Sequence, residues 1–213
     1  MDDSRAERLK SVNEHKRGII LAAARRVFES VGLEGASMRA IAREAGYTAG
    51  AIYFHYDGKE AIYGDLLAHS LARLDAAVGE SISPDGPRFA ALRAGALALF
   101  DYYATNPRDL DLGFYLINGM HPRGLTRELN MRLNERLRGI VRRLEAVMRT
   151  LGADEPVAER EAAALFAHCV GLLLMMHTGR IAIFGHDPRV LFEQYLASLT
   201  ERLRREQSTP KDP

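Results

Sequence analysis

The fold of this protein is decided by residues 37–62, whose sequence is SMRAIAREAGYTAGAIYFHYDGKEAI. Ser37 and Thr48 are residue types that cap helix N-termini, and each precedes a short apolar pattern with helical period. Gly46 lies between the two patterns, where a glycine can take the left-handed conformation that turns the chain sharply. The residues that could meet across this turn are small: Ala42, Ala45, Ala49 and Ala51. The stretch therefore predicts a helix-turn-helix with a connection of about three residues.

Four ring-bearing residues, 53–56, end the second of these helices. Tyr56 follows Ile52 by four positions and shares its face, so both are expected to point into the core. Tyr53, Phe54 and His55 then remain on the other side. The alternative is an ordinary helical core with three aromatic rings, but this alternative does not explain the caps or the run of small residues.

Lys59 follows the rings in the first turn of the next predicted helix. Unpaired backbone N–H groups at a helix start attract phosphate, and a lysine with a purely structural role is poorly placed there. The sequence therefore predicts that Lys59 reaches the backbone of a nucleic acid.

Residues 37–62 resemble the DNA-binding domain of TetR-family transcriptional regulators, and the resemblance extends over roughly residues 15–65. It rests on Ile-Ala, Ala-Gly, an aromatic run that contains a histidine, and a lysine followed by an acidic residue, all in order. The resemblance implies an all-α homodimer with an N-terminal DNA-binding domain and a C-terminal ligand-binding and dimerisation domain. It also implies a set of residues that line the DNA: Ser37, Arg39, Thr48, Ala49, Gly50, Tyr53, Phe54, His55 and Lys59.

Three positions depart from the family pattern. Tyr47 stands where a small aliphatic residue is usual, Met38 where threonine or valine is common, and Ala51 where serine or threonine is common. The run from Ala49 to Ala51 offers few hydrogen bonds to base edges. We therefore expect Arg39 to be the main base reader, with DNA shape contributing to specificity.

The whole chain has 213 residues, a formal net charge of +1 and one cysteine, Cys169. The charge excludes a whole-molecule field that attracts nucleic acid, although residues 5–26 hold seven Arg or Lys. A single cysteine and the lack of a signal-peptide pattern favour the cytoplasm. We expect about nine helices, arranged as a flexible basic arm (1–12), a helix-turn-helix domain (13–62), a helical domain (63–206) and a disordered tail (207–213).

The later helices are expected at about 88–105, 107–119, 124–151, 156–180 and 188–206, with breaks at proline and glycine. Residues 162–179 contain no charged side chain. Two histidines, a threonine and two glycines argue against a membrane span, so this helix is expected to be covered by the core on one side and by a partner subunit on the other. The predicted dimer residues are Leu172, Met176, Leu191, Tyr195 and Leu199.

No metal site, cofactor or enzyme activity is predicted. His168 and His177 lie on nearly opposite faces of one helix, and Cys169 in an apolar stretch is expected to be inert. The sequence has no Gly-rich phosphate loop and no nucleophile beside a base. Rings and thioethers in the later helices predict a ligand pocket, although each could equally be plain core. These residues are Phe100, Tyr103, Phe114, Tyr115, Met120, Met175 and Met176.

The sequence therefore predicts a transcriptional regulator that binds operator DNA as a homodimer, a repressor released by a small, largely apolar effector. Two alternatives stay open: a constitutive architectural DNA-binding dimer without a ligand, and a helical enzyme or binder that kept the fold.

Overall fold

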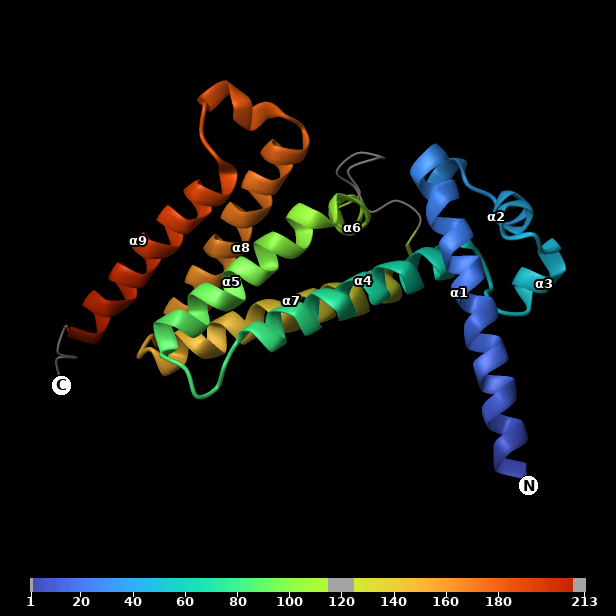
Figure 1. The fold of residues 1–213 in the computed structure, drawn as a ribbon, viewed down its shortest axis with the longest axis horizontal. Coiled ribbons are helices and arrows are strands. Elements are labelled where there is room, and N and C mark those ends of the chain that lie inside the picture. Colours follow the sequence, from blue (N-terminus) through green and yellow to red (C-terminus); the bar gives the residue numbers. More distant parts are fainter. Residues whose placement is uncertain (1, 115–124, 209–213) are drawn as a thin grey trace. The chain divides into compact units, whose positions relative to one another are not determined.

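The structure, a computed structural model, describes residues 2–114 and 125–208, and within them the regular elements are all helical (Figure 1). This confirms the prediction of an all-α fold. The nine α-helices of the described residues are α1 (Asp2–Gly35), α2 (Met38–Ala45), α3 (Ala49–Tyr53), α4 (Lys59–Ser81), α5 (Arg88–Thr105), α6 (Pro107–Phe114), α7 (Arg127–Thr150), α8 (Glu155–His177) and α9 (Pro188–Ser208). A short 3-10 helix, η2 (Arg180–Phe184), lies between α8 and α9 and was not predicted. No helix among the described residues combines the length and hydropathy that crossing a bilayer needs.

The chain divides into two compact units. The first contains Met1–Ser70 and Asp111–Leu133, and the second contains Leu71–Leu110 and Asn134–Pro213. This division falls inside α4, whereas the sequence placed a boundary between residues 62 and 63. No glycine or proline marks the change, because one continuous helix carries the chain from one set of core contacts to the other.

The core of the first unit joins α1, α2, α3 and the start of α4. Its buried residues are Ile20, Leu21, Ala24, Phe28, Leu33, Ala36, Met38, Ile41, Ala42, Ile52, Tyr56, Ile62, Tyr63 and Leu66. Leu112 and Leu125 pack against it from later in the chain, and the Tyr63 hydroxyl donates to the Leu112 carbonyl at 2.8 Å. These contacts explain why residues 111–133 join the first unit.

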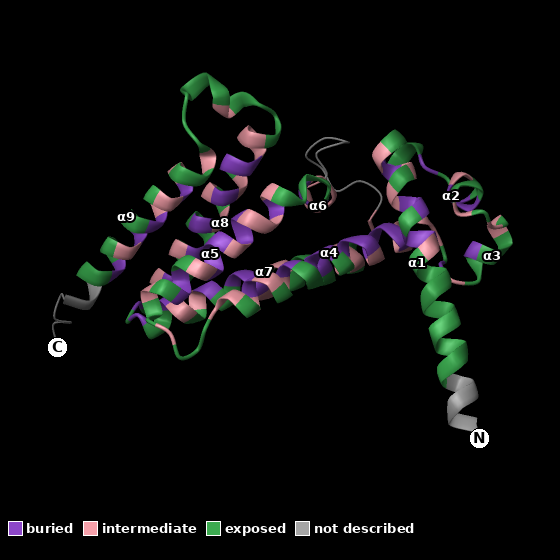
Figure 2. Cartoon of the chain, viewed as in Figure 1, coloured by how far each residue is buried: buried purple, intermediate pink, exposed green. Residues whose placement is uncertain are grey.

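Helix α1 begins well before this core. Among the described side chains of α1, Ile20 is the first buried one, and side chains 7–18 are all exposed (Figure 2). Residues 2–12, which were expected to form a flexible arm, are helical and continuous with α1. No proline interrupts them, and Gly18 is the only glycine before Gly32. At the other end of the chain α9 reaches Ser208, and residues 209–213 of the predicted tail lie outside the described residues.

The core of the second unit is built by α5, α8 and α9 with parts of α4 and α7. The rings of Phe100 on α5 and Phe192 on α9 stack at 5.1 Å between centroids. Gly95 allows a close approach, since a Cβ there would lie 2.9 Å from both Ile82 and Leu144. The buried face of α9 consists of Phe192, Leu196, Leu199 and Leu203.

A buried carboxylate fastens the start of α6 within the second unit. Asp109 is 2% exposed, and its Oδ2 accepts hydrogen bonds from Arg73 of α4 at 2.7 Å and from the Tyr102 hydroxyl of α5 at 2.5 Å. The carboxylate thus links three helices.

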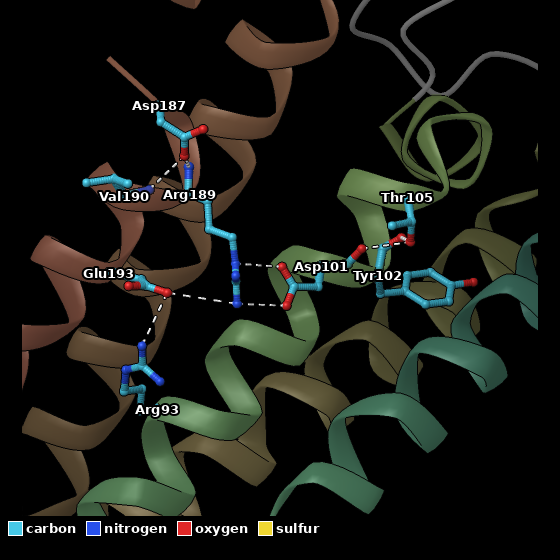
Figure 3. Close-up of polar contacts among 8 residues, drawn as sticks. All are labelled: Arg93, Asp101, Tyr102, Thr105, Asp187, Arg189, Val190 and Glu193. Atoms are coloured by element: carbon cyan, nitrogen blue, oxygen red, sulfur yellow. Dashed lines mark hydrogen bonds and ion pairs between the residues drawn. The ribbon is translucent and has the colours of Figure 1, made fainter.

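An exposed ion-pair network fixes the start of α9 on α5 (Figure 3). Asp187 caps α9 by accepting from the backbone N–H groups of Arg189 and Val190, at 2.8 and 3.0 Å. Arg189 then reaches Asp101 with two nitrogens, at 2.9 and 3.1 Å. Both side chains of that pair are nearly half exposed, whereas the Asp109 carboxylate is buried.

Candidate nucleic-acid interface

Helix α2 begins and ends as its sequence predicts. The Ser37 hydroxyl accepts a hydrogen bond from the Ala40 N–H at 3.1 Å, which satisfies one of the free donors at the helix start. Gly46 has φ 71° and ψ 25°, the left-handed conformation that ends the helix. The next N–H, of Tyr47, donates to the Ala42 carbonyl at 2.9 Å. This bond and the left-handed Gly46 fix the turn between α2 and α3.

Helix α3 is a short element with one buried face. The Thr48 hydroxyl accepts from the Ala51 N–H at 3.2 Å, so Thr48 caps the helix as predicted. Ile52 is completely buried, and Ala49 packs partly against the core. Gly50 faces open space, since a Cβ added there would meet no atom within 4 Å. The start of α3 therefore presents a surface with little bulk.

The aromatic run divides between core and solvent. Tyr53 is 55% exposed and Phe54 81% exposed, while Tyr56 is 5% exposed, as its spacing from Ile52 predicted. His55 is half-buried, and its ring lies edge-on to Phe54 with 5.2 Å between centroids. Two large rings facing water are costly unless a partner covers them.

The buried Tyr56 is held by a polar cluster behind α3. Its hydroxyl donates to Asp65 Oδ2 at 2.7 Å, and Arg17 donates to the same oxygen at 2.9 Å. The Arg17 guanidinium also lies over the Tyr56 ring, 4.8 Å from its centroid. Burial alone raises the pKa of the Asp65 carboxyl, but the bonds from Tyr56 and Arg17 outweigh it and hold that pKa below its usual value. This cluster joins α1 and α4 to the end of α3.

Lys59 has a structural role that the sequence did not predict. Its ammonium donates to the backbone carbonyls of Glu34 and Ala36, both at 3.0 Å. These carbonyls lie at the C-terminal end of α1, where helices have acceptors without intrahelical donors. The view that a structural lysine is poorly placed here is therefore wrong, because the helix it stabilises is a distant one. Its contact with DNA stays a prediction.

Arg39 lies on the exposed face of α2 and has no hydrogen-bond or ion-pair partner among the described residues. By contrast, Arg26 of α1 pairs with Glu44 of α2 at 2.5 Å. An exposed guanidinium beside the helix-turn-helix is available to a base edge or a phosphate.

A hollow of about 230 Å³ lies between α1 and α3, and we call it the α1–α3 hollow. It is lined by Lys16, Ile20, Tyr47, Ala51, Phe54 and His55. Neither Lys16 nor Tyr47 was predicted to belong to a site. The departure of Tyr47 from the family pattern was the available signal, whereas nothing local singles out Lys16 from other surface lysines.

Residues 20–66 match the family model described as bacterial regulatory proteins, tetR family. The N-terminal domain of the chain belongs to the TetR family. The matched residues contain the helix-turn-helix, the aromatic run and Lys59, so the family of the N-terminal domain and its DNA-binding class agree with the sequence prediction. No curated protein sequence matches the chain.

Solved structures share the fold over most of the chain. A regulatory protein in the tetR family from Rhodococcus RHA1 is 22% identical, covers 89% of this chain and 95% of its own, and has a TM-score of 0.65. A protein from Pseudomonas aeruginosa PAO1 described as a transcriptional regulator is also 22% identical, with coverages of 90% and 91% and a TM-score of 0.68. The transcriptional regulator FadR from Bacillus subtilis, solved in complex with stearoyl-CoA, is 18% identical, with coverages of 84% and 95% and a TM-score of 0.66. These relatives show that the TetR-like architecture extends beyond the N-terminal domain.

The predicted ligand residues do not line one described cavity. Phe100 and Tyr103 are each 1% exposed and belong to the core of the second unit, while Met175 and Met176 are half-buried. Phe114 is half-buried and belongs to the first unit. Two further predicted residues, Tyr115 and Met120, lie outside the described residues.

Another hollow, of about 540 Å³, lies in the second unit between the turn after α4 and the end of α7. None of the predicted ligand residues lines it. Two arginines do: Arg143 binds Asp75 through two nitrogens, at 2.6 and 2.9 Å, and Arg88 donates to the Thr150 carbonyl at 2.5 Å. Both cations already have protein partners.

Two of the predicted dimer residues are covered largely or wholly by their own chain: Leu172 is 7% exposed and Leu199 is 0% exposed. Their part in a dimer interface stays a prediction. A helix that is apolar all round cannot reveal from its sequence which face its own chain covers. Met176, Leu191 and Tyr195 are half-buried and keep some surface.

His168 and Cys169 of α8 are packed side chains, whereas His177 is exposed and has a polar contact. His168 stacks on Tyr195 at 4.3 Å between centroids, and burial lowers its pKa. His177 Nε2 lies 3.0 Å from the Tyr103 carbonyl. Cys169 is completely buried, and burial raises the pKa of its thiol, which opposes nucleophilic reactivity. Within the described part of the chain, no group of three or more His, Cys, Asp and Glu is placed to hold a metal.

Proposed function

We propose that this TetR-family protein is a transcriptional repressor that binds operator DNA through α2 and α3 as a homodimer and is released by a small, largely apolar effector. The observation that carries the proposal is the exposed face of α3. Its buried side is filled by Ile52, while Tyr53 and Phe54 face solvent at 55% and 81% exposure. A groove of DNA would cover these rings, and phosphates would bind the polar tips.

The contacts with DNA divide by chemistry. Ser37 and Thr48 already accept bonds from their own helices, so their hydroxyls keep their hydrogens for phosphate oxygens. Gly50 admits a close approach to the groove floor, and Phe54 offers apolar contact to a thymine methyl. Tyr53, His55 and Lys59 are proposed to contact phosphates. Arg39 is then the main side chain for direct base readout.

The proposed dimer surface lies on the faces of α8 and α9 that the chain leaves open. On α8 the exposed residues between Arg160 and Leu174 are small and uncharged: Ala163, Ala164, Ala167 and Gly171. Half-buried apolar residues border them, among them Met176 of α8 and Leu191 and Tyr195 of α9. A second copy packing there would form a four-helix interface. Two-fold symmetry would then present α3 to half-sites about 34 Å apart or a multiple of this spacing.

The effector class rests on composition and on one structural relative. The second unit contains aromatic rings and thioethers, of which Met175 and Met176 keep exposed surface. The Bacillus subtilis FadR structure holds stearoyl-CoA, which has a long apolar chain. An amphipathic molecule with an apolar body is therefore the class to test first. A protein that acts on operator DNA works in the cytoplasm, in agreement with the use of a single cysteine.

The test is a selection of duplexes from a random 30-base-pair library, followed by affinity measurements on the enriched sequences. We expect an enriched two-fold symmetric motif and a strong dependence of affinity on salt. Enrichment without any symmetric motif would favour an architectural DNA-binding dimer. No retention of duplex at any salt concentration would refute the proposed function.

The effector is tested with the selected duplex. Acyl-CoA esters and free fatty acids are titrated into the complex, and we expect one of them to weaken operator binding about 5- to 150-fold. By linkage, the operator must weaken the binding of that molecule by the same factor. A ligand that binds equally well with and without operator would show that the bound site does not control DNA binding.

A further inference from the structure

The α1–α3 hollow is built from three segments of the first unit. Lys16 and Ile20 come from adjacent turns of α1, Tyr47 from the turn between α2 and α3, and the remaining lining residues from α3 and the residues just after it. Phe54 and His55 therefore belong both to this hollow and to the face proposed to meet DNA. The hollow is a lateral extension of that face.

The walls of the hollow are fixed. The Tyr47 N–H is bonded to the Ala42 carbonyl directly after the left-handed Gly46, and its ring packs against the core of the first unit. The His55 N–H donates to the Ile52 carbonyl at 2.8 Å, and its ring rests against Phe54. Two polar tips, the Tyr47 hydroxyl and the His55 imidazole, are thus presented by residues with little freedom.

The charge of the hollow is positive. Lys16 is exposed and has no ion-pair or hydrogen-bond partner among the described residues, whereas its neighbour Arg17 is bound to Asp65. No carboxylate lines the hollow. The lining therefore combines one available ammonium with a phenol and an imidazole, which are both able to donate hydrogen bonds, and this set suits an anion.

We propose that the α1–α3 hollow binds a phosphate of the DNA backbone beside the base pairs under α3, with Lys16 and Tyr47 as donors. The apolar wall formed by Ile20, Ala51 and the Phe54 ring packs against the adjoining deoxyribose. This inference rests on the proposed function, which it deepens by adding two DNA contacts from outside α2 and α3.

The occupant is a DNA backbone rather than a free organic anion for two reasons. The hollow shares Phe54 and His55 with the exposed face of α3, so DNA lying on that face passes its mouth. Its volume of about 230 Å³ is also smaller than the about 300–1,000 Å³ of pockets that enclose small-molecule ligands. A phosphate and a sugar that remain part of a longer polymer need no enclosure.

The test measures the salt dependence of binding to a fluorescein-labelled 30-base-pair duplex of mixed sequence, by anisotropy between 25 and 200 mM KCl. The variants are Lys16→Gln and Tyr47→Phe, with Lys10→Gln as the matched control. Lys10 is exposed on the same helix, six residues earlier and on a different face. Circular dichroism confirms that each variant is folded.

We expect Lys16→Gln to weaken binding by about tenfold and to reduce the slope of log K against log salt by about 0.9, the contribution of one phosphate. Tyr47→Phe should weaken binding about threefold without changing the slope, since it removes a neutral donor. Lys10→Gln should leave the slope unchanged.

Equal losses of slope in Lys16→Gln and Lys10→Gln would overturn the proposal, since they would show only a diffuse attraction to the charge of α1. An unchanged slope in Lys16→Gln with wild-type binding intact would overturn it as well. A second arm measures the thermal stabilisation of the protein by dodecanoate, a small amphipathic anion. If Lys16→Gln abolished this stabilisation and left DNA binding intact, the hollow would hold such an anion and not DNA. Failure of the wild-type protein to bind any duplex would instead refute the proposed function itself.

Discussion

Lys59 combines two structural hydrogen bonds with a predicted DNA contact. One substitution removes both, and two assays measure the two effects separately. Lys59→Met removes the ammonium and keeps an unbranched apolar side chain of similar length. The two bonds to the Glu34 and Ala36 carbonyls, both at 3.0 Å, would then be lost. The end of α1 would have to replace them with water.

The size of the loss follows from burial. The bond to Glu34 is exposed and that to Ala36 part-buried. Water replaces the exposed bond at a cost of about 0.5 kcal/mol, and the part-buried one costs about 1 kcal/mol. Loss of a cation near a helix C-terminus adds about 0.3 kcal/mol. We therefore expect Lys59→Met to lower the free energy of unfolding by about 1.5–2 kcal/mol.

The assay is urea denaturation followed by circular dichroism, at one protein concentration for every variant because a dimer's stability depends on concentration. Lys10→Met is the control, and its change should lie within about 0.5 kcal/mol. DNA affinity is then measured at a temperature where both variants are fully folded. A loss of affinity under those conditions measures the DNA contact separately from the structural role. A stability change for Lys59→Met no larger than for Lys10→Met would refute the structural role.

Three further predictions concern the second unit. Asp109→Ala should lower the free energy of unfolding by about 2–3 kcal/mol, because it breaks an ion pair whose carboxylate is buried and whose cation is half exposed. Asp101→Ala in the exposed network of Figure 3 should lower it by about 1 kcal/mol or less. Similar losses for the two variants in urea denaturation would contradict this ranking. Leu199→Asp should unfold the protein by circular dichroism, whereas Ala164→Asp on the open face of α8 should give folded monomers by light scattering; a folded dimer in the second variant would exclude that face as the interface. Because burial lowers the pKa of His168, the folded state resists protonation of this side chain, and the free energy of unfolding should decrease as the pH falls below about 6.5. Urea denaturation at pH 7 and pH 5.5 should show a smaller decrease for His168→Phe than for the wild-type protein. An equal decrease in both would assign the pH dependence to other groups.

The local features of the helix-turn-helix were predictable from sequence because each depends on residues within four positions of one another. The caps at Ser37 and Thr48, the left-handed Gly46 and the inward direction of Tyr56 all have this origin. Hydrogen-bond geometry and helical period act over a single turn, so a pattern of residues contains the whole argument.

The tertiary structure decided the features that depend on distant parts of the chain. Lys59 meets carbonyls 23 and 25 residues away, and Asp109 meets Arg73 at a separation of 36. Packing on α5 determines which side of α8 and of α9 the chain itself covers. The burial of Leu172 and Leu199 therefore does not follow from the sequence of either helix alone. Lys16 and Tyr47 likewise line one hollow only because the fold brings distant parts of the chain together. A sequence specifies which residues are able to bind one another, but the path of the backbone decides which of them come within reach.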